Sequence, residues 1–159
     1  MDGSETTSKI APISGVDLSG TWHFADLRLI YADGRVTRPW ANSASGALIY
    51  APDGHMSLTL NYPGRGGRIE CRSICGQYQI VDGRLLHFII VSGDISEVGT
   101  VQEHEIALAG RSLTTTVHPA PAGGPGSRLD YHWNRADPRT AGAGTFLRAN
   151  AARGFNRAR

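Results

Sequence analysis

Apolar residues alternate with polar ones along eight short stretches of this chain, and Gly, Pro or Asp separates each stretch from the next. A period of two is typical of strands with one buried face, whereas an amphipathic helix repeats every three or four residues. Asp53-Gly54 and Asp82-Gly83 each join two such stretches and predict tight hairpins, because the favoured turns need positive φ. The predicted strands cover about 20–31, 45–51, 55–62, 69–81, 84–92, 99–109, 112–118 and 127–135.

Eight strands joined by short turns predict an all-β fold, in which a single antiparallel barrel closes on itself and so removes its unpaired edges. A barrel of this size is filled by side chains or holds one small ligand. We predict a flexible leader over residues 1–16, the barrel over 17–137, and a basic tail rich in Ala, Gly and Arg over 138–159. A short helix around 145–153 is one conformation that we consider for the tail.

The composition fits one soluble domain, with 159 residues, 40% hydrophobic and 19% charged. No stretch approaches the roughly 18 apolar residues that a membrane helix needs. The first 14 residues are polar and lack the apolar segment of a secretory signal. We therefore expect a cytoplasmic protein with no membrane partner.

The net charge of +2 is unevenly distributed. Every acidic residue lies at or before Asp137, and five arginines follow it. Subtracting those five from the 16 basic residues leaves 11 against 14 acidic ones, so the barrel region is near −3. Because no aromatic interleaving or nucleic-acid motif accompanies the arginines, we expect a solvated tail and no nucleic-acid partner.

Several short motifs, in order along residues 18–135, resemble those of the lipocalin-like domain family of small calycin-type barrels. They are Leu18-Ser19-Gly20-Thr21-Trp22, Gly46-Ala47-Leu48-Ile49-Tyr50, Pro52-Asp53-Gly54-His55-Met56-Ser57, Gly76-Gln77-Tyr78, Leu86-His87, Gly99-Thr100-Val101-Gln102 and Trp133-Asn134-Arg135. The resemblance implies an up-and-down barrel with a ligand-sized interior, and it fixes no activity. Members resemble binding proteins as well as cyclases and isomerases of natural-product pathways.

By this resemblance, Trp22 points inward at the closed end of the barrel and Arg135 packs across it as a structural plug. The chain departs from the family at one place. The family often continues Gln-x-Arg in the sixth strand, whereas here Gln102 is followed by Glu103 and His104. A titratable ring in place of a guanidinium implies a different cavity chemistry.

Alternation predicts which polar side chains face inward. In the first strand, Trp22 shares its face with Phe24, Asp26 and Arg28, unless a bulge turns the last two outward to form an ordinary ion pair at the rim. In the sixth, Gln102 and His104 share a face with Ile106 and Leu108. Tyr78 shares one with Ile80, and Tyr131 one with Trp133.

His87 is not placed by alternation, because residues 85–91 are apolar on both faces. It fits best a core histidine bonded to a hydroxyl or carbonyl, and the alternative is a neutral imidazole that shuttles a proton beside a ligand. Glu103, His104 and Glu105 do not form a metal site, because adjacent strand residues point to opposite faces.

The leading hypothesis is a cofactor-independent cyclase or isomerase that confines a small, largely apolar biosynthetic intermediate inside the barrel. The alternatives are a non-catalytic carrier of a hydrophobic small molecule, or a barrel whose interior is filled. No phosphate loop, nucleophile elbow, dinucleotide fingerprint or zinc motif is present, so no cofactor is expected. A homodimer is a further option. The catalytic candidates are Asp26, Tyr78, His87 and His104; the ligand-binding candidates are Phe24, Arg28, Tyr50, Met56, Leu58, Gln102 and Tyr131.

Overall fold

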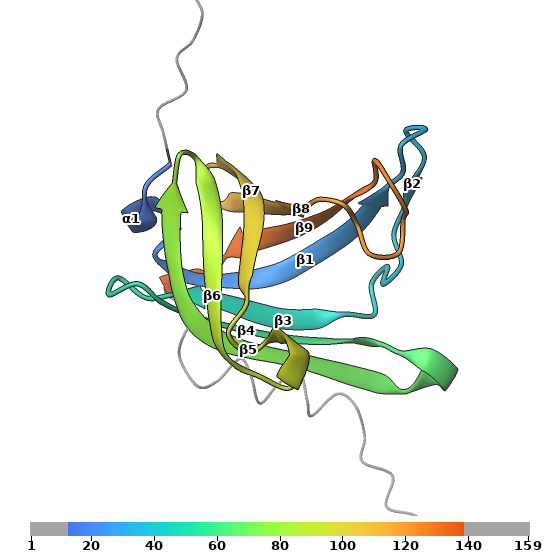
Figure 1. Cartoon of the computed structure of the whole chain (residues 1–159), viewed down its shortest axis with the longest axis horizontal. Coiled ribbons are helices and arrows are strands. Elements are labelled where there is room, and N and C mark those ends of the chain that lie inside the picture. The colour runs from blue at the N-terminus through green and yellow to red at the C-terminus, as the bar shows by residue number, and fades with distance from the viewer. Residues whose placement is uncertain (1–12, 139–159) are drawn as a thin grey trace, which may run out of the picture.

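A computed structural model of the chain describes residues 13–138, and these residues form a barrel (Figure 1). Two short helical turns, η1 and η2, and a helix, α1, accompany the strands. Their bounds are α1 (Gly15–Leu18), η1 (Arg65–Gly67) and η2 (Ile95–Glu97). The strands are β1 (Gly20–Ile30), β2 (Val36–Thr37), β3 (Ser45–Tyr50), β4 (His55–Pro63), β5 (Ile69–Val81), β6 (Arg84–Ser92), β7 (Val101–Ala109), β8 (Ser112–Val117) and β9 (Arg128–Arg135).

The sheet is an antiparallel meander closed by the pairing of its first long strand with its last. Neighbours follow the order β1-β3-β4-β5-β6-β7-β8-β9, and β9 returns to β1 over most of its length. This confirms the predicted fold class, a closed eight-stranded antiparallel barrel. The two-residue strand β2, which pairs with the end of β1, is an addition that the hydrophobic pattern did not predict.

The predicted hairpin between β5 and β6 turns at Asp82 and Gly83, whose φ angles are +50° and +76°. Positive φ at both central positions is the geometry whose twist matches the flanking strands. The turn sets the register Val81↔Arg84, so Tyr78 stands opposite His87. The turn thereby aligns two of the predicted site residues.

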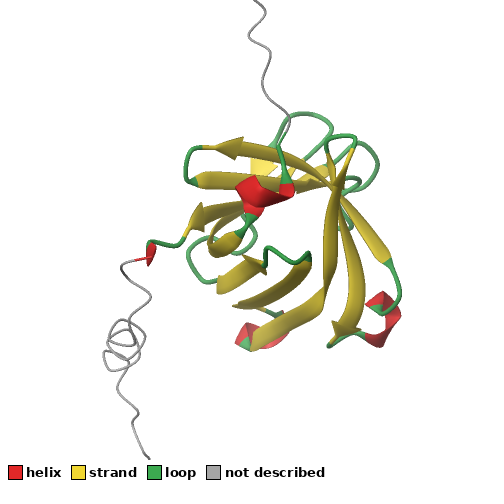
Figure 2. Cartoon of the chain, turned by 90° about the vertical axis from the view of Figure 1, so that its left-hand side faces the viewer, coloured by secondary structure: helices red, strands yellow, loops and turns green. Residues whose placement is uncertain are grey.

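One end of the barrel is closed by α1, which lies across the end that faces the viewer in Figure 2. Trp22 is fully buried there, and its Nε1 donates a hydrogen bond to the carbonyl of Leu18 at 2.8 Å. Arg135 covers the indole ring, with Cζ 4.2 Å from its centroid. This is the arrangement that the family resemblance implied for these two side chains.

A bulge in β1 overturns the prediction that Asp26 and Arg28 face inward. Between Phe24 and Asp26 the register with β9 shifts by one residue, so Ala25 is the extra residue in β1. Leu27 and Leu29 are buried after the bulge, while Asp26 and Arg28 move to the outer face. There Asp26 accepts from Nε of Arg28 and of Arg38, each at 3.0 Å. The rim ion pair, the stated alternative, is therefore present, and both arginines hold the pKa of Asp26 below its usual value against the effect of burial.

At the other end of the barrel, the turn after β1 lies beside the connection between β8 and β9, as Figure 1 shows near β2. An aromatic cluster packs at this end around Trp40, from the connection between β2 and β3. Its ring stacks on Tyr62 at 4.6 Å between centroids and also contacts Phe24 and Tyr131. Trp40 therefore joins the first, fourth and last strands.

Among residues 13–138, no helix has the length and apolar character that crossing a membrane requires. The tail helix considered around 145–153 lies outside the described residues, as do residues 1–12. The proposed boundaries of the barrel at residues 17 and 137 stay predictions.

Candidate functional site

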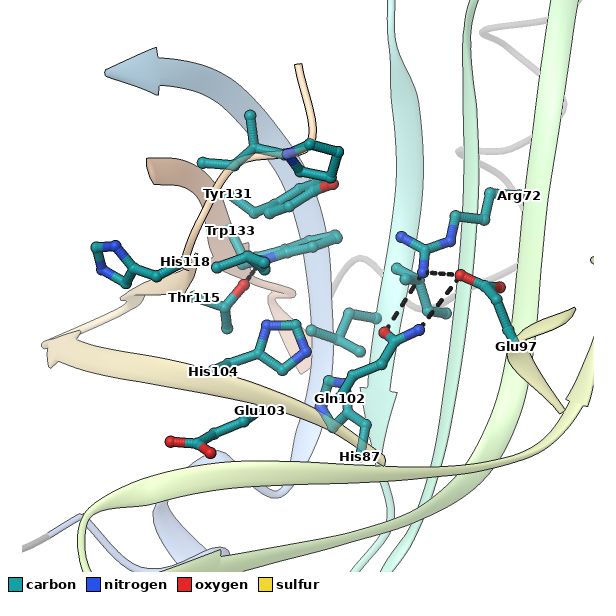
Figure 3. A pocket seen from close by; sticks show the side chains of 15 residues that line it. Arg72, His87, Glu97, Gln102, Glu103, His104, Thr115, His118, Tyr131 and Trp133 are labelled. Carbon is teal, nitrogen blue, oxygen red and sulfur yellow. Dashed lines mark hydrogen bonds and ion pairs between the residues drawn. The ribbon is translucent and has the colours of Figure 1, made fainter. Parts of the chain in front are cut away.

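The barrel contains a cavity of about 390 Å³ (Figure 3). Pockets that hold small molecules begin at about 300 Å³ and combine mostly apolar walls with a few placed polar groups. This cavity fits that description, because one wall is apolar and aromatic and the other carries a few polar side chains. A closed barrel of this size with such an interior is an architecture that holds one small ligand.

One wall is apolar and aromatic, and it comes from β3, β4, β8 and β9. The rings of Tyr131 and Trp133 lie nearly parallel at 14°, with centroids 6.2 Å apart. Trp133 donates from Nε1 to the hydroxyl of buried Thr115 at 3.1 Å, so its polar edge is satisfied. Burial raises the pKa of Tyr131 and keeps it a neutral phenol. The same wall includes Leu48, Leu58, Val117, Pro121 and Leu129.

The opposite wall carries a network centred on Glu97 of η2, drawn with dashed lines in Figure 3. One of its oxygens, Oε1, accepts from Nη2 of Arg72 at 2.5 Å and from the amide of Gln102 at 3.2 Å. Oε2 accepts from the hydroxyl of Ser92 at 2.7 Å. Both carboxylate oxygens are thus engaged, and the charge of Arg72 is opposed at close range.

The remaining charged group at the cavity, Glu103, also has an opposite partner, because it lies 3.6 Å from Nε of Arg84. Nε2 of His118, which also lines the cavity, lies 3.4 Å from Glu105. Since Arg72 is paired with Glu97, no charged side chain among those lining the cavity lacks a counter-charge within the described part of the chain. The cavity is therefore close to electrically neutral.

His104 is the exception to this pattern of satisfied polar groups. It is 8% exposed, and neither ring nitrogen has a hydrogen-bond partner within residues 13–138. Burial, with a smaller effect from the charge of Arg72, lowers its pKa to about 4, so the ring is neutral at pH 7. An unsatisfied buried polar group costs about 1–3 kcal/mol. A ligand group that bonded to the ring would offset that cost.

His87 lies beside His104, with ring centroids 4.5 Å apart, and it is also buried. Its Nε2 is 2.8 Å from the hydroxyl of fully buried Tyr50. Burial raises the pKa of Tyr50 well above its usual value, so this group is a phenol. Burial, helped by His104 and Arg72, lowers the pKa of His87, so the second imidazole is neutral as well. The structure thus settles the orientation that alternation left open.

The structure brings five of the predicted side chains to the cavity. Tyr50 and Met56 lie just behind the wall as buried core residues, and Phe24 packs against Trp40 and Trp133. Asp26 and Arg28 are outside the barrel, as described above. The five that line the cavity are Leu58, His87, Gln102, His104 and Tyr131.

Tyr78 faces inward as predicted, but its hydroxyl reaches the closed end of the barrel. It lies 3.0 Å from the carbonyl of Ala51 and 3.3 Å from that of Gly15. Its ring packs on Tyr50 at 4.6 Å between centroids. Tyr78 is not among the cavity-lining residues, and its contacts support Tyr50 and the turn after β3.

Sequence reasoning missed Arg72 and Glu97, the charged pair at the cavity. Arg72 has the same phase along β5 as buried Ile74 and Tyr78, so alternation does carry a signal for it. The chain lacks the arginine that the family often places two residues after Gln102. Arg72 of β5 nevertheless contacts Gln102, and its Nη2 lies 3.4 Å from Oε1 of that residue. Glu97 belongs to a helical turn, where strand alternation gives no information.

Within residues 13–138, no three His, Cys, Asp or Glu side chains converge closely enough to hold a metal ion. The polar groups at or next to the cavity include two neutral imidazoles, the phenols of Tyr50 and Tyr131, and the ion pair of Arg72 with Glu97.

One family model matches part of this chain. The model of a family described as a lipocalin-like domain matches residues 19–74, which confirms the resemblance over that part of the chain. No curated protein matches the sequence.

Among solved structures, the chain is similar to an uncharacterized protein from Bacteroides eggerthii, with 15% identity and a TM-score of 0.41; the match covers 76% of this chain and 100% of that one. It is also similar to a redesigned beta barrel, with 14% identity and a TM-score of 0.45, covering 78% of this chain and 96% of that one.

Proposed function

We propose that this protein binds one small, largely apolar molecule inside its barrel. The observation that carries the proposal is the cavity of about 390 Å³ with an aromatic wall on one side and a neutral polar wall on the other. Apolar surface supplies most of the affinity in such sites, and a few polar groups fix the orientation. The match of the lipocalin-like family model supports the same class of function.

The test is a titration with N-phenyl-1-naphthylamine, an uncharged dye that fluoresces in apolar surroundings. Leu58→Trp fills the cavity from β4, where Leu58 is 7% exposed and lines the wall. Thr59→Trp adds the same ring at the next position, on the outer face. We expect saturable binding to the native protein, at least about tenfold weaker binding to Leu58→Trp, and unchanged binding to Thr59→Trp. Equal effects of the two variants would place the dye outside the cavity and count against the proposal.

A second candidate function is a cyclase or isomerase without a cofactor. The contact that favours it is the chain from Tyr50 to His87 and on to His104. A neutral imidazole both accepts and donates a proton, so a ring beside a confined substrate is able to act as general base and then general acid. Asp26 has no part in this version, because it lies on the outer face.

Incubation with a metabolite extract from the source of the protein separates the two functions. A carrier returns its ligand unchanged, whereas an isomerase or cyclase returns an isomer of identical mass. If the histidines carry the chemistry, His104→Ala abolishes turnover and still binds substrate. Unchanged rates in both His104→Ala and His87→Ala would exclude histidine acid–base chemistry and leave confinement as the mechanism.

A further inference from the structure

The polar side of the cavity also specifies the chemical class of the ligand's polar group, if the barrel binds a small molecule as proposed. The two imidazoles have defined hydrogen-bond capacities, the charged groups are already paired, and the facing wall is aromatic.

His104 offers one donor and one acceptor, because a neutral imidazole has one protonated nitrogen and one bare one. Both are without a partner among residues 13–138. Adjacent His87 is more restricted. Within the described residues, its Nε2 is the single hydrogen-bond partner of the Tyr50 hydroxyl, at 2.8 Å.

The phenolic proton of Tyr50 therefore goes to Nε2, since leaving it unbonded in the core costs about 1–3 kcal/mol. This assigns the hydrogen of His87 to Nδ1, which is then a donor. The two rings together present two donors and one acceptor. A ligand group that both donates and accepts fits this set.

A charged ligand group fits poorly. Arg72 is the cation at the wall, and Glu97 already binds its Nη2 at 2.5 Å. Both oxygens of Glu97 already accept hydrogen bonds, because Arg72 and Gln102 donate to Oε1 and Ser92 donates to Oε2. The charges of Arg72 and Glu97 offset each other, so an anion or a cation would bring a net charge into a cavity whose own charges are already paired. Burying either without a counter-charge is strongly unfavourable.

We infer that the ligand carries an uncharged hydroxyl, as in an alcohol, a phenol or an enol, which binds at His104, and that its apolar body lies against Tyr131 and Trp133. A hydroxyl donates once and accepts twice, so it is able to satisfy both kinds of site on the imidazoles. The stacked rings of Tyr131 and Trp133 give the facing wall its aromatic contacts.

Three probes with one skeleton test this inference at pH 7 by isothermal titration calorimetry. They are 2-naphthol, which donates and accepts, 2-methoxynaphthalene, which accepts only, and 2-naphthoate, which is charged. We expect 2-naphthol to bind about 3- to 10-fold more tightly than the methoxy compound, as one hydrogen bond provides. It should also bind at least about tenfold more tightly than the carboxylate.

His104→Phe keeps a ring of similar size and removes both nitrogens, so the preference for 2-naphthol over 2-methoxynaphthalene should disappear. His23→Phe, on the outer face of β1, is the matched control and should keep the preference. If His104→Phe does not fold, the native protein still gives an answer: the ¹⁵N resonances of the His104 ring should shift when 2-naphthol is added.

The outcomes separate this inference from the proposed function. Tightest binding of 2-naphthoate would overturn the uncharged group and leave the barrel a small-molecule binder anchored by Arg72. Equal binding of 2-naphthol and 2-methoxynaphthalene would overturn the role of His104. Absence of binding by all three probes and by N-phenyl-1-naphthylamine would overturn the proposed function, and this inference with it.

Discussion

The guanidinium of Arg135 lies over the indole ring of Trp22, with Cζ 4.2 Å from the ring centroid. It also donates to the carbonyl of Ser19 at 2.7 Å and to the carbonyl of Asp17. One side chain from the end of β9 therefore holds the segment that leads into β1. The closed end depends on this contact, while the cavity lies farther along the barrel.

Replacing Arg135 by Ala should lower the free energy of unfolding by about 2–4 kcal/mol, because the cation–π contact and two hydrogen bonds to the chain are lost. Urea denaturation measures this. Arg35→Ala is the matched control, since Arg35 lies 4.0 Å over the Tyr31 ring but with its side chain 63% exposed. Its loss should stay below about 1 kcal/mol. Equal losses in the two variants would show that the contact between Arg135 and Trp22 stabilises the fold no more than an exposed contact does.

Tyr50→Phe removes the hydroxyl bound to His87 and leaves Nε2 of that ring without a partner in the core. We expect a loss of about 1–3 kcal/mol in the free energy of unfolding. The double variant Tyr50→Phe/His87→Phe should be less destabilised than the sum of the single variants, because both polar partners are then gone. Strict additivity in this cycle would argue that the two groups are not bonded.

Acid should destabilise the protein through His104. In the unfolded chain this group binds a proton below about pH 6.5, whereas in the folded protein its pKa is about 4. Between these values the unfolded state binds more protons, so the free energy of unfolding falls as the pH drops through this window. The loss from this group reaches about 3 kcal/mol by pH 4.

His104→Phe should flatten that pH dependence, and at pH 7 it should be neutral or stabilising because an unsatisfied polar group is removed. Burial also lowers the pKa of His87, so this group accounts for any pH dependence of the unfolding free energy that remains in the variant. Denaturation series at several pH values provide the measurement, with His23→Phe as the control that keeps the native slope. An unchanged slope in His104→Phe would mean that the ring is not buried as a neutral group.

Glu97→Gln should reverse the charge preference of the cavity. It leaves Arg72 without its counter-charge, so the affinity for 2-naphthoate should rise by about tenfold or more. Glu105→Gln, which alters a carboxylate that also faces an arginine, Arg84 at 2.8 Å, but does not line the cavity, should leave this affinity unchanged. Calorimetric titration of both variants with 2-naphthoate measures the two affinities. No gain in Glu97→Gln would show that Arg72 is inaccessible to ligands.

The strands were predictable because each has a buried face and ends at Gly, Pro or Asp, and their bounds agree with the prediction to within two residues at most. The site was less predictable. Alternation assumes an unbroken phase, and one extra residue at Ala25 reverses it for Asp26. Arg72 was in phase with buried neighbours, but an arginine is usually a surface residue and so escaped notice.

His87 shows a different limit of the sequence. Its strand is apolar on both faces, so only the register with β5 and β7 reveals that the ring points inward. Glu97 and Trp40 come from connections between strands, where no periodicity applies. These residues come together through the pairing of strands that are distant in the sequence, and no local pattern of residues encodes that pairing.

The single extra residue in β1 decides which side chains face the interior beyond it. Asp26 and Arg28 are in phase with Trp22 along the sequence, and the bulge at Ala25 turns them outward and brings Leu27 and Leu29 inside. Removing Ala25 would remove the bulge and keep this arrangement, whereas a residue added to β9 as a pairing partner for Ala25 would turn Asp26 and Arg28 inward. One residue gained in the partner strand is thus a means by which related barrels replace an apolar interior with a charged one.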